Sequence, residues 1–341
     1  MKKTLVAVAA LATISGAMAD VTIGGLVDAG VYSIGATTAA GAKTTTVGVG
    51  PQNNGSDELF FTATEDLDGG LKATARLGFN VNATTSASGP TNRISYLGLA
   101  GSFGEVQVGE QWKPGFFTVL NADFTGLVST SGAGLVGPGA MAAYTANSIT
   151  YTLPKIVDGL GFQYQKGYGE AAGNTGGNTS GYRVEYTNSG FYASYSAETA
   201  AMTAAGTFTG NTIGGTTDNL LVTTALGTNL KSSFYNASYD FGMAKIGVGS
   251  GSSQAGATAK STSTIYSLSA PVGSALVLAA SVTAGQQVTS AAVATNTKGQ
   301  RYAAFYTLSK RTSLYAFTGT SSAGSASRKT TETAAGIKHT F

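Results

Sequence analysis

The chain has 341 residues, 48 of them glycine, with no cysteine and a formal net charge of +3. Only 11% of the residues are charged, well below the ~25% usual in soluble proteins, which argues against an ordinary soluble enzyme of two domains. The absence of cysteine excludes disulfide frameworks, thiolate zinc sites and cysteine nucleophiles, and the lack of a basic cluster argues against nucleic-acid binding.

The first 19 residues have the pattern of an export signal. Two lysines are followed by a short apolar run and by Ala17-Met18-Ala19, a small-x-small cleavage site. The apolar run is too short for a spanning helix, which needs about 20 residues. We therefore expect a signal peptide at 1–19 and a mature chain of 20–341 with 18 basic and 17 acidic residues.

Segments of about ten residues with alternating apolar and polar side chains recur along the mature chain. In 71–80 the apolar face carries Leu71, Ala73, Ala75, Leu77 and Phe79, and the polar face carries Lys72, Thr74, Arg76, Gly78 and Asn80. The same alternation occurs in 160–165, 182–186 and 235–241. A soluble sandwich buries its apolar face, whereas a transmembrane barrel turns that face to lipid. The alternation alone leaves both folds open.

The connections favour the barrel. Short turns are indicated at 67–69, 101–104, 154–159, 188–190, 241–243, 271–273 and 309–312. Longer polar links are indicated at 35–55, 81–91, 112–145, 167–181, 197–231, 251–262, 285–298 and 320–331. This strict alternation is typical of outer-membrane barrels and predicts an all-β, sixteen-stranded antiparallel transmembrane barrel, wide enough for an aqueous channel. Within it, 219–231 is either a strand extension or part of a loop.

The link at 112–145 interrupts the alternation most strongly. It contains several Gly, Pro and Ser residues, only two charged residues, Lys113 and Asp123, and no sustained period. Such long loops are usually functional or disordered. We expect this insert to fold into the lumen and to set the width and charge of the channel. A surface loop that covers nothing in particular is the alternative.

The chain ends on an alternating segment that closes with an aromatic residue. Phe341 shares its face with His339 and Ile337. A terminal Phe on such a strand resembles the signal read by the outer-membrane barrel assembly machinery, and His339 stands where an aromatic residue is usual in that signal. An ordinary closing strand that ends in Phe is the alternative.

Several segments resemble the general-diffusion porins of Gram-negative bacteria. They are VTIGGLVDAGVY at 21–32, TEDLDGGLKA at 64–73, RISYLGLAGSFGEVQVG at 93–109, NSITYTLP at 147–154 and the terminal GIKHTF. Each is weak alone, but their order and spacing are specific over most of the mature chain. The resemblance implies a homotrimer in the outer membrane, with lipopolysaccharide as a neighbour. It also implies that the third outer loop, here 112–145, forms the constriction.

In that family, arginines on the barrel wall face acidic residues of the third loop. Arg93, in the segment NRISYLGL, matches one wall arginine. Glu58 and Tyr144 stand where two other arginines are common, and Glu110 also stands where a basic residue is common. These departures leave the ion selectivity open, while the fold is unaffected.

We expect charged side chains of both signs at the narrowest point, beside Tyr144. The basic candidates are Arg93, Arg76 and Lys72, with Arg183 in addition. The acidic candidates are Asp123 and Glu58, with Glu110 in addition. Fixed charges at a constriction set ion preference. The mixture predicts passive diffusion of ions and small hydrophilic solutes with a weak preference for anions.

Three other functions are weighed against this one. A substrate-specific channel for sugars, nucleosides or organic acids would share the fold, and the aromatic residues of the insert keep it open. A surface adhesin would have a similar composition. A membrane-embedded hydrolase would need a histidine base, and the single histidine is predicted to face lipid near the chain end. No phosphate loop or calcium loop occurs, so no cofactor or metal is expected.

Overall fold

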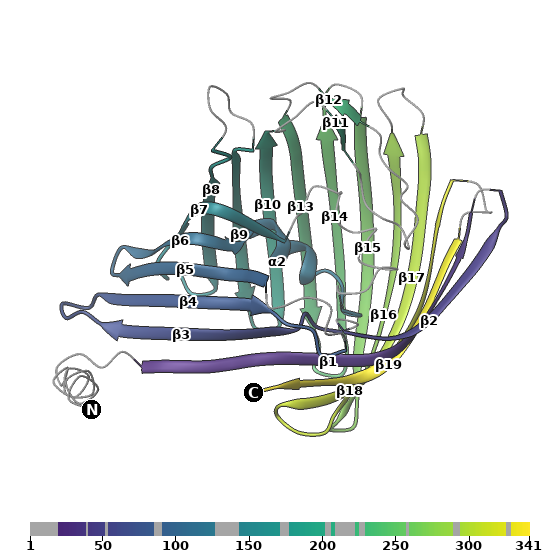
Figure 1. Cartoon of the computed structure of the whole chain (residues 1–341), viewed down its shortest axis with the longest axis horizontal. Helices are drawn as coiled ribbons and strands as arrows, with labels where there is room; N and C mark the ends of the chain where they lie inside the picture. Colours follow the sequence, from purple (N-terminus) through teal and green to yellow (C-terminus); the bar gives the residue numbers. More distant parts are fainter. Residues whose placement is uncertain are drawn as a thin grey trace, which may run out of the picture.

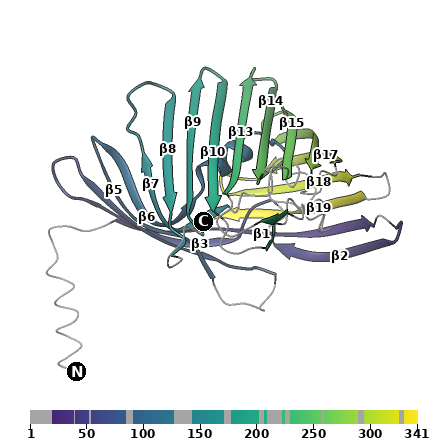
Figure 2. The same cartoon turned by 90° about the horizontal axis from the view of Figure 1, so that it is seen from above.

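The computed structural model describes residues 20–38, 40–51, 54–84, 91–126, 143–170, 177–201, 206–208, 222–224, 229–256, 259–288, 294–324 and 329–341. Most of them lie in long antiparallel strands that form the wall of a barrel (Figure 1). Figure 2 shows the same wall from above, curving from β5 through β8–β10 to β17–β19. The predicted signal peptide and residues 127–142 of the insert lie outside the described residues.

In the described part of the chain, seventeen strands form one sheet. The first nine are β1 (Asp20–Thr37), β2 (Lys43–Pro51), β3 (Glu58–Asp66), β4 (Lys72–Asn80), β5 (Thr91–Gly101), β6 (Gly104–Trp112), β7 (Tyr144–Thr152), β8 (Leu160–Gly167) and β9 (Thr179–Asn188). The others are β10 (Phe191–Ala201), β13 (Asn229–Asp240), β14 (Lys245–Ala255), β15 (Ala259–Val272), β16 (Leu276–Val288), β17 (Ala294–Thr307), β18 (Thr312–Ala323) and β19 (Lys329–Thr340). A separate hairpin consists of β11 (Gly206–Phe208) and β12 (Val222–Thr224).

The long first strand closes the barrel. On one edge it pairs with β19, from Leu26 opposite Thr340 to Thr37 opposite Lys329. On its other edge it pairs first with β3 and then with β2. Because β2 and β3 lie end to end along β1, the described strands occupy sixteen positions around the wall. The predicted sixteen-stranded antiparallel barrel is confirmed.

The two faces of the wall differ in the way expected of a membrane barrel. On β13, Tyr235 is 55% exposed, whereas the neighbouring Asn236 is 4% exposed. On β4, Leu77 is 57% exposed, whereas the Arg76 side chain is only 20% exposed. Apolar side chains therefore point outward and polar side chains point into the lumen. This arrangement is the inverse of a soluble sandwich.

An arginine on the outer face should destabilise the protein. Leu97 on β5 is 68% exposed, so Leu97→Arg would place a charge in the lipid and cost about 2–4 kcal/mol near the bilayer midplane, less toward the interfaces. We expect a lower unfolding temperature in detergent and less assembled protein in membranes. Gln107→Arg is the control, because Gln107 pairs with Gly98, next to Leu97 on the opposite face. Equal losses for both variants would contradict this assignment of the faces.

Each predicted short turn is found between described strands, but several predicted links are shorter than expected. The link 35–55 contains β2, and the link 251–262 is mostly strand, since β14 runs to Ala255 and β15 begins at Ala259. In the ambiguous segment 219–231, β12 belongs to a loop hairpin and β13 starts at Asn229. The link segments are rich in Thr, Ser and Gly, so both faces are polar or small and the alternation disappears.

The insert runs, as predicted, between the end of β6 at Trp112 and the start of β7 at Tyr144. Its described part contains a short helix, α2 (Pro114–Leu120), which the sequence analysis did not predict. A proline at the first helical position fixes φ near the helical value and removes an N–H that would be unpaired there. No helix in the described ranges is long and apolar enough to cross a membrane.

Candidate functional site

The described part of the insert, residues 113–126, is called the inner loop here. Its apolar side chains pack on apolar residues that lie on the otherwise polar lumen face of the wall. Val119 and Ala122 form a buried cluster with Phe234 and Ile265, both fully buried. Phe234 and Ile265 come from β13 and β15. Apolar residues thus point inward where the inner loop covers the wall.

A second apolar patch holds the end of the inner loop. Phe124 packs against a buried cluster whose members come from β16 to β19: Ala279, Ala303, Tyr315, Phe317 and Ala334. Lys245, on β14, has its amine 4.6 Å from the centre of the Phe124 ring. The inner loop therefore crosses a large part of the barrel interior and ends against the last strands.

Polar contacts follow the same path. The N–H of Gly115 donates to Glu198 on β10 at 3.0 Å, and Asn121 donates to the hydroxyl of Tyr192 at 2.7 Å. Further along, Ser267 on β15 donates to the carbonyl of Ala122 at 2.7 Å. These bonds satisfy backbone and side-chain groups that burial would otherwise leave unpaired. They fix the inner loop to the wall from β10 to β15.

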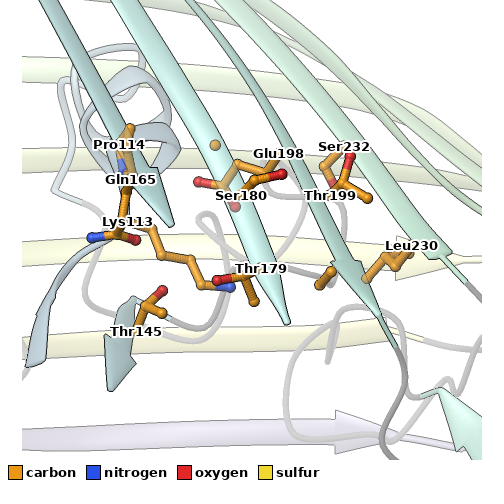
Figure 3. Close-up of a pocket in the computed structure, with 12 residues that line it drawn as sticks. Lys113, Pro114, Thr145, Gln165, Thr179, Ser180, Glu198, Thr199, Leu230 and Ser232 are labelled. Atoms are coloured by element: carbon orange, nitrogen blue, oxygen red, sulfur yellow. The ribbon is translucent and has the colours of Figure 1, made fainter. Parts of the chain in front are cut away.

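The start of the inner loop encloses a small cavity, which is shown in Figure 3. Its volume is about 10 Å³, room for one water molecule. Lys113 and Glu198 line it from opposite sides, together with Gln165, whose amide donates to the Trp112 carbonyl at 3.0 Å. Polar side chains of the wall and of the loop thus pack closely around the start of α2. The cavity between them is too small for a solute.

Asp123 is 4% exposed and lies at the end of the inner loop. Its carboxylate accepts hydrogen bonds from the backbone N–H and the hydroxyl of Thr125, at 2.9 and 2.6 Å. Burial raises the pKa of Asp123, while the Thr125 bonds and the nearby Arg301 charge act in the opposite direction. The structure thus brings Asp123 to Arg301 on β17.

Arg301 is the main charged residue that the sequence analysis missed. It is 1% exposed, its guanidinium donates to the Gly126 carbonyl at 2.5 Å, and it lies 3.9 Å from the centre of the Phe317 ring. A signal was present in the sequence, because Arg301 alternates with the exposed Tyr302 in 299–307, beyond the predicted link at 285–298. Glu198 was missed because it lies in the predicted link 197–231, whereas β10 continues to Ala201.

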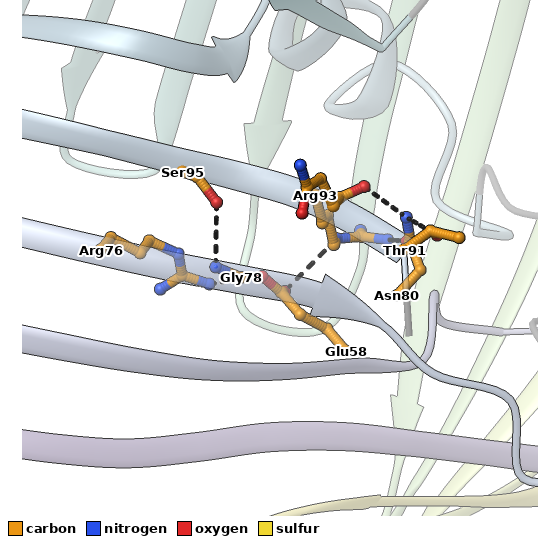
Figure 4. A network of polar contacts seen from close by, with 8 residues as sticks. Glu58, Arg76, Gly78, Asn80, Thr91, Arg93 and Ser95 are labelled. Atoms are coloured by element: carbon orange, nitrogen blue, oxygen red, sulfur yellow. Dashed lines mark hydrogen bonds and ion pairs between the residues drawn. The ribbon is translucent and has the colours of Figure 1, made fainter. Parts of the chain in front are cut away.

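A compact charged group, called the wall cluster here, lies on β3, β4 and β5 (Figure 4). Glu58 pairs with both arginines, with Arg76 at 2.6 Å and with Arg93 at 3.5 Å. Arg93 also donates to the side-chain oxygen of Asn80 at 2.6 Å. Two guanidinium groups share one carboxylate, so the three side chains carry a net charge of +1. The structure brings together the predicted site residues Arg76, Arg93 and Glu58.

A β-bulge places Arg93 in the wall cluster. The register of β4 and β5 shifts between Leu77, opposite Ser95, and Phe79, opposite Asn92. Arg93 and Ile94 therefore both lie opposite Gly78. Ser95 pairs with the outward-facing Leu77, so strict alternation from Ser95 would turn Arg93 outward, and the register shift turns it inward instead. Bulges re-aim side chains in this way and are common beside functional sites.

Aromatic rings lie close to the guanidinium group of Arg93. The Trp112 ring stacks on Phe116 at 4.5 Å and lies 4.6 Å from Tyr144, as measured between ring centroids. The Arg93 guanidinium is 5.4 Å from the Trp112 ring and 5.3 Å from the Tyr144 ring, within the range of cation–π interactions. Tyr144, a predicted constriction residue, therefore lies beside the wall cluster.

Other predicted residues lie elsewhere. Lys72 pairs at 3.6 Å with Asp66 beside the β3–β4 turn and is half exposed, outside the wall cluster. Arg183 pairs with its neighbour Glu185 on β9. Glu110 lies within the register shift between β6 and β7. Asp123 lies beside the wall arginine Arg301, and no contact in the described part of the chain joins it to Arg76 or Arg93.

The two residues of the predicted assembly signal lie at the end of β19. His339 and Phe341 are both exposed, with ring centroids 6.5 Å apart. The Nδ1 atom of His339 lies 2.9 Å from the hydroxyl of Thr312 on β18. The exposed histidine agrees with the outward face predicted for it. Its role in assembly stays a prediction.

Comparisons with known proteins agree with this architecture. An anion-selective porin from Comamonas acidovorans superimposes with a TM-score of 0.77 over 95% of this chain and 100% of its own, at 24% identity. The trimer form of OmpT from Vibrio cholerae gives a TM-score of 0.70 over the same shares, at 15% identity. At these identities the likeness shows the fold.

Sequence relatives match a shorter stretch. Major outer membrane protein P.IB of Neisseria meningitidis serogroup B is 39% identical over 111 residues, 32% of this chain and 33% of the relative. The protein of the same name from Neisseria lactamica is 36% identical over 110 residues. The matched stretch thus spans about a third of these relatives' length. The family model described as Gram-negative porin matches residues 7–325. The chain therefore belongs to the Gram-negative porin family, and its barrel lies in the outer membrane.

Proposed function

We propose that this chain forms a water-filled channel through which ions and small hydrophilic solutes diffuse passively, with a weak preference for anions. The observation that carries the proposal is a closed barrel whose lumen face is polar and whose interior is crossed by the inner loop. Barrels of sixteen strands are wide enough to hold water. The inner loop packs on the lumen face of the wall and so narrows that opening.

The preference for anions rests on the wall cluster. Arg76 and Arg93 share the single carboxylate of Glu58, which leaves one positive charge unbalanced there. The negative charge of Asp123 lies beside the positive charge of Arg301, so these two charges offset each other. A net charge at a constriction favours the opposite ion. The Comamonas porin with the same fold is named as anion-selective, which supports the proposal.

Solute uptake into liposomes tests the channel and separates it from a substrate-specific one. Liposomes that contain the purified protein should swell in neutral sugars at rates that fall steadily with solute size and do not saturate. Saturation with one sugar or organic acid would favour the specific channel instead. An absence of swelling with every small solute would overturn the proposal.

We also propose that the protein works as a homotrimer beside lipopolysaccharide and is inserted by the barrel assembly machinery. The trimer form of the Vibrio protein, which has the same fold, supports the first point. The exposed Phe341 and His339 at the end of β19 are accessible to an assembly factor, which supports the last.

Phe341→Ala, which keeps the backbone hydrogen bonds with Gly25, should reduce assembly. The ring is 47% exposed, so its loss opens no core cavity, and the effect would come through recognition during insertion. We expect less heat-modifiable protein in the outer membrane and an unchanged unfolding temperature in the fraction that assembles. Leu308→Ala, which truncates a similarly exposed side chain in the β17–β18 turn, is the control. Normal assembly of Phe341→Ala would contradict the prediction.

A further inference from the structure

The wall is interrupted between β2 and β3. Pro51 is paired with Ala29 of β1, and Glu58 is paired with Leu26. Six residues, 52–57, therefore stand opposite only two residues of β1. Such an excess must leave the sheet on one side or the other. Residues 54–57 of this segment are described, and this part is called the bulge here.

The bulge lies inside the barrel. The N–H of Asn54 donates to Asp28 on β1 at 2.5 Å, and the same carboxylate accepts a hydrogen bond from the hydroxyl of Tyr315 at 2.6 Å. Tyr315 belongs to the lumen-facing cluster that contacts Phe124 of the inner loop. The amine of Lys338 on β19 lies 3.5 Å from the Asn54 carbonyl. The bulge thus rests on lumen-facing side chains of β1, β18 and β19.

Two aspartates that have no part in the wall cluster hold the bulge. Asp28 and Asp57 are both fully buried. One carboxylate oxygen of Asp57 accepts the N–H of Asp28 at 2.7 Å, and the other accepts the N–H of Ala83 at 3.1 Å. Buried carboxylates are rare unless they are hydrogen-bonded in this way. The bonds tie the bulge to β1 and to the chain that follows β4.

The bulge meets the end of the inner loop. The side-chain oxygen of Asn54 lies 3.2 Å from the position that a Cβ atom would take on Gly126. Gly126 has a φ of +87°, which favours glycine, and its carbonyl accepts the Arg301 bond from the other side. The inner loop and the bulge therefore touch within the lumen, and the gap between them is closed at this point.

We propose that the bulge, residues 54–57, is a second constriction element and that Asn54 lines the ion path. The inference rests on the proposed channel function. The bulge occupies the lumen beside β1 and β19, so it narrows the channel on this side. Asn54 is half-buried where the bulge meets Gly126 of the inner loop. A charge introduced at Asn54 therefore acts directly on passing ions.

Charge substitutions at Asn54 test this proposal. Reversal potentials under a potassium chloride gradient are measured on the full chain in planar bilayers. Asn54→Lys should shift the reversal potential toward anions, and Asn54→Glu should shift it toward cations. Asn188→Lys and Asn188→Glu, in the exposed β9–β10 turn, are matched controls and should leave it unchanged.

Reversal potentials that stay at the wild-type value in both Asn54 variants would overturn the proposal while leaving the channel function intact. Absence of conductance in the wild-type protein would instead overturn the channel function, so the two failures are distinguishable. Tyr315→Phe provides a second test, because it removes only the hydroxyl bond to Asp28 and keeps the ring in its cluster. It should raise single-channel conductance by loosening the bulge. An unchanged conductance in a folded Tyr315→Phe protein would count against the bulge as a constriction element.

Discussion

Glu58→Gln should raise the preference of the channel for anions several-fold. The substitution removes the carboxylate that Arg76 and Arg93 share, so the net charge of the wall cluster rises from +1 to +2. A unit charge 4 Å from an ion contributes about 1 kcal/mol in bulk water and more in a narrow, poorly screened path. Since 1.4 kcal/mol corresponds to tenfold, we expect roughly a fivefold increase in the anion-to-cation permeability ratio.

Reversal potential under a salt gradient measures this ratio directly. Arg93→Gln should move it in the opposite direction, because it removes one of the two positive charges. Asp66→Asn, in the exposed pair with Lys72, removes an acidic charge outside the cluster and should have little effect. If Glu58→Gln and Asp66→Asn shift the ratio equally, the wall cluster does not determine selectivity. Because Arg93 is buried, the unfolding temperature of each variant should be recorded as well.

Arg301→Ala should release the end of the inner loop. The substitution removes the bond to the Gly126 carbonyl and the contact with the Phe317 ring, and it removes the positive charge that acts on the buried Asp123 and Glu332. Loss of one member of a buried group of opposite charges typically costs about 3–5 kcal/mol. We expect a lower unfolding temperature, together with a larger and noisier single-channel conductance, because the displaced loop no longer narrows the lumen in one position.

A double-mutant cycle tests the pairing of Arg301 with Asp123. Asp123→Asn alone should also loosen the loop, and the double variant should be destabilised by less than the sum of the two single variants. Lys298→Ala removes an exposed positive charge from the same strand and serves as the control. Strict additivity, or a conductance in Arg301→Ala that matches the control, would contradict this role for Arg301.

The wall of the barrel could be predicted from the sequence because most strands carry one apolar and one polar face. In 235–241, for instance, exposed tyrosines alternate with buried Asn236 and Ser238, and a transmembrane barrel requires that pattern. The prediction failed where both faces are polar or small. The ends of β14 and β15 are of this kind, and their pairing comes from hairpin partners that a single segment does not reveal. In β2 the alternation of Val47 and Val49 with glycine is too short to mark a strand.

The candidate site was predictable only in part. Arg76, Arg93 and Glu58 come from strands that are neighbours in the chain, so local alternation and the resemblance to porins brought them together. The pairing of Asp123 with Arg301 joins residues that are far apart in the chain, and no local pattern predicts it. The bulges beside Arg93 and at 52–57 also break the two-residue period, so the faces of the side chains near them could not be assigned by counting.

The most direct test of the channel is the single-channel conductance of the purified protein in a planar bilayer, recorded together with the reversal potential under a potassium chloride gradient. The structure predicts stepwise openings in the absence of any added ligand, with a small reversal potential on the anion side. A protein that inserts into the bilayer but never conducts, or one that conducts with strong cation selectivity, would contradict the account of an open lumen bordered by a positively charged wall cluster.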